Sequence, residues 1–255
     1  MEVLVLIIAR GGSKSIPHKN ILELAGYPLI AYSIAAGLAS TFVTRVIVST
    51  DDEQIASIAR RFGAETPFMR PSALAQDDTP DLPVFQHALR WLAEQEGYQP
   101  EIVVQLRPTS PFRRVWHIDQ AVQSLIERPE ADSVRTVCVP FQNPFKMWLI
   151  GVDGFMQPLI PNMPGLRATS PSQTQLEPYN LPRQMLPEVH WQTGYVDVAW
   201  TETILCKKSM TGERILPLVI APSEWVDIDS FDDWERAEQK IKSGELTFAD
   251  LGFNL

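Results

Sequence analysis

Short apolar runs rich in Val and Ile alternate with segments of helical periodicity along the first half of the chain. Residues 3–8, 45–49 and 101–106 are such runs, and helical patterns separate them. Strands buried on both faces are continuously hydrophobic, and strands that alternate with helices build βαβ units. The pattern therefore predicts an α/β fold with a mostly parallel sheet and helices on both faces.

The remaining elements follow from the same periodicities. We expect strands at residues 3–8, 45–49, 101–106, 132–139, 194–200, 215–220 and 226–228, and helices at 29–38, 52–62, 81–96, 115–126 and 230–242. Thr50-Asp51 is expected to cap the second helix. Ser230 and Asp233 resemble a capping box for the last helix. With about 150 residues per domain as a guide, residues 1–255 predict a single domain with an insertion.

The insertion is expected at residues 140–190, where the alternation of strands and helices breaks. Nine of the 21 prolines lie between Pro140 and Pro187. Proline fixes φ and removes a backbone donor, so regular elements there should be short. Large apolar side chains such as Trp148 and Phe155 favour packing against another surface. We interpret the segment as an inserted arm that closes a pocket or forms a dimer contact; a mobile surface loop is the alternative.

Composition and charge narrow the classes of partner. The net charge of −9 argues against a broad nucleic-acid surface, which needs clustered basic residues. The longest apolar run, residues 3–9, is far shorter than the roughly 20 residues of a membrane span. The amino terminus lacks the basic flank of a signal peptide, and the two cysteines are far apart. We therefore expect a reduced, cytoplasmic protein with no nucleic-acid or membrane partner.

A basic loop at residues 9–20 follows the first predicted strand directly. It contains three cations and no carboxylate: Arg10, Lys14 and Lys19. Gly11 and Gly12 allow close approach of the backbone, and their N–H groups suit phosphate oxygens. The loop matches neither the GxxxxGK[ST] nor the GxGxxG pattern. It predicts a phosphate site, with a solvated basic turn as the alternative.

Two carboxylates, Asp227 and Asp229, lie two residues apart on the last predicted strand. Residues i and i+2 of a strand share a face, so the two charges would repel unless a cation lay between them. Oxygen ligands of this kind suit Mg²⁺. The pair predicts a metal site opposite the basic loop, although acidic pairs also cap helices.

A third candidate is the segment of residues 105–113, at the carboxyl end of a predicted strand. Ligands bind at such ends in α/β sheets, so Arg107 is a candidate ligand contact. A proline-stiffened turn with an exposed arginine explains the same residues equally well. Further candidate cations, each more typical of surface charge when taken alone, are Arg70, Lys146 and Arg183.

Taken in order, these segments resemble the signatures of the acylneuraminate cytidylyltransferases, the CMP-sialic acid synthetases. The segment Ala-Arg-Gly-Gly-Ser-Lys-Ser-Ile-Pro-His-Lys-Asn-Ile at residues 9–21 is the most specific of them. The other matching segments are residues 48–51, 70–71, 74–77, 107–111, 182–184 and 227–229. They occur in the family's order, with compatible spacing, over almost the whole chain.

The resemblance implies a Rossmann-like nucleotidyltransferase fold and a homodimer in which the arm of one subunit reaches over the partner's site. The implied reaction joins CTP and a nonulosonic acid, giving a CMP-sugar and pyrophosphate with Mg²⁺. Its attacking group is the anomeric hydroxyl of the sugar, in line on the α-phosphate. Such transfers depend on positioning and on charge neutralisation more than on covalent chemistry.

The resemblance also assigns residues. The implied CTP-binding set is Arg10, Gly11, Ser13, Lys14, Lys19, Asn20 and Arg70. The implied sugar-binding set is Arg107, Lys146, Arg183, Gln192 and Thr193. Asp227 and Asp229 match the metal ligands. Arg10, Lys19 and Asp229 are the implied catalytic residues: the cations stabilise the leaving pyrophosphate, and an aspartate assists deprotonation of the sugar hydroxyl.

Two departures from the family pattern fall at the expected sugar site. Arg107 stands where sialic acid enzymes often have glutamine, and Thr193-Gly194 where they often have Asn-Gly. We therefore expect CTP together with a relative of sialic acid, such as legionaminate, pseudaminate or a deaminated form. Arg107 would pair with the substrate carboxylate or with Asp197. A nucleotidyltransferase for a sugar 1-phosphate, a DxD glycosyltransferase and a catalytically silent nucleotide-binding protein are the alternatives.

Overall fold

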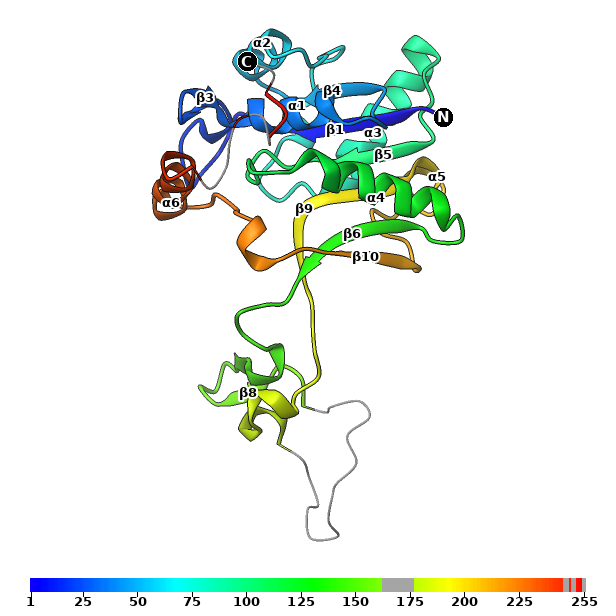
Figure 1. Cartoon of the computed structure of the whole chain (residues 1–255). Coiled ribbons are helices and arrows are strands. Elements are labelled where there is room, and N and C mark those ends of the chain that lie inside the picture. Colours follow the sequence, from blue (N-terminus) through cyan, green and yellow to red (C-terminus); the bar gives the residue numbers. More distant parts are fainter. Residues whose placement is uncertain (162–176, 245–247, 249–250, 254–255) are drawn as a thin grey trace. The chain divides into compact units, whose positions relative to one another are not determined.

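The computed structural model describes residues 1–161, 177–244, 248 and 251–253 (Figure 1). The chain forms two compact units. The first consists of Met1–Val137 and Gln192–Leu255, and the second of Cys138–Trp191. Within the described ranges, no helix is both long enough and apolar enough to span a bilayer.

The first unit is built on a six-stranded sheet. In spatial order its strands are β10 (Ile215–Val219), β6 (Ser133–Cys138), β9 (Trp191–Trp200), β5 (Ile102–Gln105), β1 (Val3–Ile8) and β4 (Arg45–Ser49). β1 runs parallel to both β4 and β5, and β10 runs parallel to β6, whereas β5 and β9 are antiparallel. A small hairpin, β2 (Glu23–Leu24) and β3 (Tyr27–Pro28), precedes the first helix.

Helices cover both faces of this sheet. The helices are α1 (Leu29–Ala39), α2 (Glu53–Arg61), α3 (Asp81–Glu96), α4 (Val115–Glu127), α5 (Thr201–Leu205) and α6 (Phe231–Lys242). α1 packs closely on one face, because a Cβ atom at Gly37 would lie 3.2 Å from the Val46 side chain. On the other face, Leu4 and Leu6 of β1 pack with apolar side chains of α3 and α5. The predicted α/β fold is confirmed.

The helix caps show how local chemistry sets the boundaries. The α2 cap is Asp52, whose side chain accepts from the N–H groups of Gln54 and Ile55, so the prediction of Thr50-Asp51 was one residue early. The capping box at α6 is confirmed, since the side chains of Ser230 and Asp233 each accept from the other's backbone N–H.

The predicted strand at 226–228 is wrong. Residues 225–229, all of them described, belong to no helix and no sheet. The backbone N–H of Ile228 donates to Thr109 O at 2.8 Å, which attaches the segment to a loop and not to a strand. The alternation of Val226 and Ile228 with aspartates thus predicts the burial of Ile228. A strand also needs a neighbouring strand to pair with, and the local pattern does not show whether one is present.

The second unit covers nearly the same residues as the predicted arm at 140–190, of which residues 162–176 lie outside the described ranges. Its strands β7 (Trp148–Ile150) and β8 (Met156–Pro158) are short and antiparallel, as expected for a proline-rich segment. Many of its large apolar side chains are exposed, and they include Phe141, Met147, Leu149, Ile150, Phe155 and Met156. Its role in dimerisation stays a prediction.

Candidate active site

A cleft of about 440 Å³ lies in the first unit, a volume typical of small-molecule sites. Its walls are the loop after β1, the loop before α3, the first turn of α3, the loop after β5, and Asp229. β1 and β5 are parallel neighbours. The cleft therefore lies where α/β sheets bind ligands, beyond the carboxyl ends of adjacent parallel strands.

The cleft brings together most of the residues assigned to CTP. Six of the seven line it, namely Arg10, Ser13, Lys14, Lys19, Asn20 and Arg70. The seventh, Gly11, has another function in the structure: its N–H donates to Asp51 Oδ1 at 3.1 Å. A Cβ atom at this position would lie 2.7 Å from Asp52 Oδ2, so only glycine lets the loop pass so close to the start of α2.

Asp77 neutralises two of the cations. Its carboxylate pairs with Arg10 at 2.5 Å and also with Lys14. The lysine contact is the main cause of a lowered Asp77 pKa, and the hydrogen bond from Arg10 lowers it further. Asn20 fixes the loop by donating from Nδ2 to Arg10 O at 3.0 Å.

Arg70 is buried at the wall of the cleft. Its Nη2 lies 3.7 Å from Asp51 Oδ1. Nε and Nη2 have no hydrogen-bond partner among the residues that the structure describes. Burial is the main reason why the pKa of Arg70 is lowered from its usual value, although it remains a strong base. Buried guanidinium donors without hydrogen-bond partners suit an anionic ligand.

Lys19 connects the basic loop to the acidic segment. The 3₁₀ turn η1 (Lys19–Ile21) carries it, and its side chain is 9 % exposed. Nζ donates to Ile228 O at 2.7 Å and to Asp229 Oδ1 at 3.0 Å. The Asp229 side chain, by contrast, is 72 % exposed and lines the cleft. Lys19 therefore places the phosphate-site loop and the predicted metal ligand side by side.

The two aspartates differ in their surroundings. Asp227 is half-buried, and its Oδ1 has no hydrogen-bond partner within the described ranges. Burial raises the pKa of Asp227, and the neighbouring charge of Asp229 raises it further. In the described part of the chain, no three His, Cys, Asp or Glu side chains gather as a metal-ligand set. Two carboxylates, one with an unpartnered oxygen, nevertheless fit Mg²⁺, which usually takes one or two carboxylates together with water and substrate phosphates.

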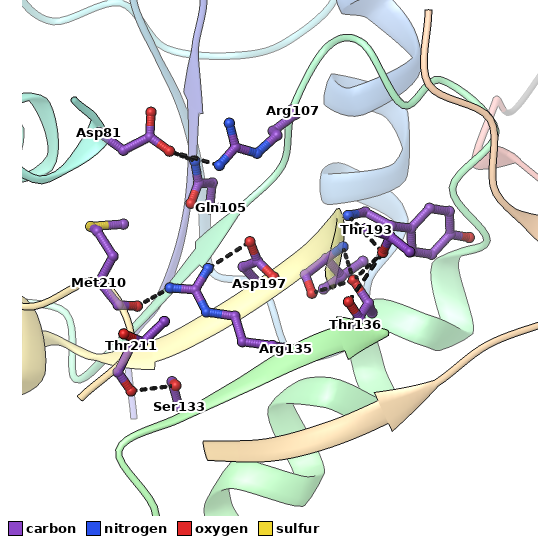
Figure 2. Close-up of polar contacts among 12 residues, drawn as sticks. Asp81, Gln105, Arg107, Ser133, Arg135, Thr136, Thr193, Asp197, Met210 and Thr211 are labelled. Atoms are coloured by element: carbon purple, nitrogen blue, oxygen red, sulfur yellow. Dashed lines mark hydrogen bonds and ion pairs between the residues drawn. The ribbon is translucent and has the colours of Figure 1, made fainter. Parts of the chain in front are cut away.

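Arg107 reaches the cleft from the loop after β5. Its Nη2 donates to Asp81 Oδ2 at 2.7 Å (Figure 2). The alternative pairing with Asp197 is wrong, because the carboxylate of Asp197 forms a buried ion pair with Arg135 at 2.6 Å.

A buried arginine supports this loop from behind. Arg113 is fully buried and donates to Tyr195 O at 2.5 Å, to Ser33 Oγ at 3.0 Å and to Arg107 O at 3.1 Å. It thereby joins the loop after β5 to α1 and β9. Burial lowers the pKa of Arg113 to about 10, so the guanidinium stays charged at neutral pH.

The other residues assigned to the sugar lie elsewhere. Thr193 is buried, and its hydroxyl donates to the backbone O of Thr136 at 3.2 Å and contacts Thr136 Oγ1 at 3.0 Å (Figure 2). Gln192 is exposed and does not line the cleft. Lys146 and Arg183 belong to the second unit, where they donate to Tyr179 O and Pro140 O. The sugar-binding roles of these four residues stay predictions.

Sequence reasoning missed the acidic partners of the cleft. Asp77 belongs to a recognised segment but received no role, Asp51 was assigned only to a helix cap, and Asp81 was not singled out. An aspartate at the start of a helix is well explained by the helix dipole alone, so Asp81 carried no local signal of a further function. A count of carboxylates near each cation in the recognised segments would have drawn attention to Asp77.

Comparisons with known proteins identify the family of this chain. Residues 4–145 match the family model described as cytidylyltransferase. A CMP-N,N'-diacetyllegionaminic acid synthase of Legionella pneumophila is 33% identical over 243 residues, which is 95% of this chain and 97% of the relative. A pseudaminic acid cytidylyltransferase of Campylobacter jejuni is 38% identical over 127 residues, covering 50% of this chain and 54% of the relative.

Solved structures show the same fold. The structure of a CMP:2-keto-3-deoxy-manno-octonic acid synthetase complexed with CTP matches with a TM-score of 0.68 at 14% identity. The match covers 96% of this chain and all of the other. The family model and the full-length relative identify the family independently of this structural likeness. The chain therefore belongs to the cytidylyltransferase family of nucleotidyltransferases.

Proposed function

We propose that the protein activates an acidic nine-carbon sugar with CTP and releases a CMP-sugar and pyrophosphate. The observation that carries the proposal is the cleft itself, where the three cations of the basic loop and Arg70 lie beyond the carboxyl ends of parallel strands, together with Asp229. A triphosphate needs several cations, because charge builds up on the leaving pyrophosphate. The full-length legionaminate relative supports an acidic nine-carbon sugar as the second substrate.

The chemistry assigned to the residues is an in-line displacement. The anomeric oxygen of the sugar forms a bond to the α-phosphorus while the bond to the bridging oxygen of pyrophosphate breaks. Arg10, Lys14, Lys19 and Arg70 hold the triphosphate and stabilise the charge on the departing group. The proton of the sugar hydroxyl passes to the carboxylate of Asp229, which lies exposed in the cleft.

Magnesium fits this arrangement. Asp227 and Asp229 would hold Mg²⁺, which when bound supplies positive charge to the phosphate oxygens. Within the protein, Lys19 keeps Asp229 beside the basic loop through the 3.0 Å ion pair. The loss of that pair on triphosphate binding would leave Asp229 available as a ligand.

The sugar end of the cleft is assigned to Arg107. Nonulosonic acids carry a carboxylate next to the anomeric carbon, and a guanidinium binds carboxylates through paired hydrogen bonds. Arg107 lines the same cleft as Thr109 and Asp229, so its guanidinium can bind the carboxylate of a sugar held there. The relatives named for legionaminic acid, pseudaminic acid and N-acylneuraminate all support a substrate of this class.

The test is a pyrophosphate-release assay with Mg²⁺ that crosses CTP, GTP, UTP and ATP with a panel of sugars. The panel contains N-acetylneuraminate, legionaminates, pseudaminate, deaminated sialic acid and several sugar 1-phosphates. We expect turnover with CTP and an acidic nine-carbon sugar, and loss of turnover when the metal is chelated. Turnover with another nucleotide and a sugar phosphate, or CTP binding without turnover, would contradict the proposal.

We also propose a cytoplasmic homodimer in which the second unit forms the contact between copies. The exposed apolar side chains of that unit, among them Phe141, Ile150 and Phe155, support the proposal. Exposed apolar surface of this kind is typical of interaction sites.

The expected result is a molar mass of about twice 28.7 kDa in light scattering at micromolar concentration. Ile150→Glu, which places a charge among these apolar side chains, should shift the mass toward that of the single chain. An Arg61→Glu variant changes an exposed site on α2 in the first unit and serves as the control. A wild-type mass equal to that of one chain would refute the dimer.

A further inference from the structure

Asp81, in the first turn of α3, contacts Arg107 at the edge of the cleft. One carboxylate oxygen, Oδ2, accepts from Arg107 Nη2 at 2.7 Å and from Gln105 Nε2 at 2.7 Å (Figure 2). Asp81 and Arg107 both line the cleft and are both partly exposed. A single acceptor thus fixes the orientation of two side chains from the end of β5.

The position of Arg107 also depends on the strand beside it. A Cβ atom at Gly194 would lie 2.9 Å from Arg107 Nε, and the φ of Gly194 is +67°. Glycine at this position leaves room for the Arg107 side chain and adopts that backbone conformation without strain. The Arg107 side chain has many possible rotamers, and the hydrogen bond to Asp81 together with the space over Gly194 favours the observed one.

The ion pair between Asp197 and Arg135 explains why Asp81 is the counter-ion of Arg107. Gln105 lies opposite Asp197 in the register of β5 and β9, which makes Asp197 another carboxylate in the neighbourhood of Arg107. The carboxylate of Asp197 is, however, neutralised from the other side by Arg135, and both side chains are buried (Figure 2). Asp81 is left as the carboxylate that holds Arg107.

The remaining donors of Arg107 are available. In the described part of the chain, neither Nε nor Nη1 of Arg107 has a hydrogen-bond partner. Nη2 carries two hydrogens and donates one to Asp81, so its second hydrogen, together with Nε–H or Nη1–H, still presents a planar fork to a carboxylate. Lysine cannot offer this arrangement. The held side chain is therefore preorganised to bind an anion from the cleft.

We propose that Asp81 is a positioning residue, which holds the Arg107 guanidinium so that its remaining donors bind the carboxylate of the sugar. The proposal rests on the function proposed above. Asp81 itself does not contact the reacting atoms; it acts through Arg107.

A double-mutant cycle tests the proposal. Values of kcat and KM for CTP and for the sugar are measured in wild type, Asp81→Ala, Arg107→Gln and the double variant. Asp81→Ala should raise the KM for the sugar about tenfold, with the KM for CTP nearly unchanged, as is typical of coupled charged neighbours. In the Arg107→Gln background, Asp81→Ala should change the KM for the sugar by less than about twofold.

Two further variants separate positioning from general effects. Asp81→Asn keeps an oxygen acceptor and should recover part of the lost affinity; it also carries the test if Asp81→Ala fails to fold. Asp78→Ala removes an exposed carboxylate outside the cleft and controls for the change in net charge. An equal effect of Asp81→Ala with and without Arg107, or an effect on CTP alone, would overturn the proposal.

A readout independent of activity distinguishes this proposal from the proposed function. Phenylglyoxal modification of Arg107, followed by peptide mass spectrometry, should be several-fold faster in Asp81→Ala than in wild type or Asp78→Ala. Equal rates would overturn the positioning role. If the wild-type enzyme turns over no acidic nine-carbon sugar, the proposed function fails, and the modification rates still decide whether Asp81 holds Arg107.

Discussion

Asp229→Ala is expected to lower kcat by about 10²–10³-fold, the usual cost of losing one preorganised charged group in an active site. The side chain is 72 % exposed, so its truncation creates no cavity and should leave the melting temperature nearly unchanged. The loss follows from the assignment of Asp229 as metal ligand and proton acceptor. Turnover should be measured by pyrophosphate release over a range of Mg²⁺ concentrations.

The affinity for CTP distinguishes this assignment from a simple binding role. Asp229 Oδ1 forms an ion pair with Lys19 Nζ at 3.0 Å. Removal of the carboxylate leaves Lys19 available for the triphosphate, so the affinity for CTP should be unchanged or higher. Asp232→Ala serves as the control, since Asp232 is an exposed carboxylate three residues away, in the first turn of α6. Wild-type turnover in Asp229→Ala, or an equal loss in Asp232→Ala, would refute the metal assignment.

Arg113→Met should lower the free energy of unfolding by about 2–4 kcal/mol. Methionine approximates the length of the side chain, but it removes the Arg113 donor from Tyr195 O and Ser33 Oγ, whereas Arg107 O keeps the Ser33 hydroxyl as a donor at 3.2 Å. A buried acceptor without a partner costs roughly 1–3 kcal/mol, and part of the sum is offset because the charge no longer has to be buried. Urea unfolding followed by circular dichroism measures the change.

Arg113→Lys should fall between wild type and Arg113→Met, because an ammonium reaches fewer of the three acceptors. The matched control is Arg61→Met, at an exposed arginine of α2, for which we expect a change within about 0.5 kcal/mol. A midpoint for Arg113→Met equal to that of wild type would show that the three hydrogen bonds contribute nothing net. Arg113 would then contribute no net stability to the loop after β5.

Much of the sheet could be predicted from local patterns. The runs at 3–8 and 45–49 became β1 and β4 with the predicted bounds, and 81–96 became α3. These elements are buried or amphipathic over their whole length, so the hydrophobic period alone identifies them. The prediction of a strand at 226–228 failed for a different reason: Ile228 is buried in an apolar cluster that includes Phe112 and Trp234, but its backbone N–H bonds to a loop and not to a strand.

The cations of the cleft could also be predicted, since a basic loop after a buried strand is a local signal. Their partners could not, because each pairing joins positions far apart in the sequence. Arg107 illustrates this difference: its loop predicts a ligand contact, but the choice between Asp81 and Asp197 depends on where Arg135 lies. The order of the strands in the sheet decides which carboxylate pairs with Arg107, and the sequence of one segment does not reveal that order.

The pairing of each cation has a consequence for selectivity among anions. Arg10 and Lys14 share Asp77, Lys19 holds Asp229, and Arg70 faces Asp51. Each of these cations is thus paired with a carboxylate of the protein, and an anion that binds in the cleft has to replace that carboxylate. A small anion such as chloride or inorganic phosphate displaces one carboxylate at a time and gains little by the exchange. A triphosphate displaces several together, so discrimination in favour of the polyanion arises before any base or sugar is recognised.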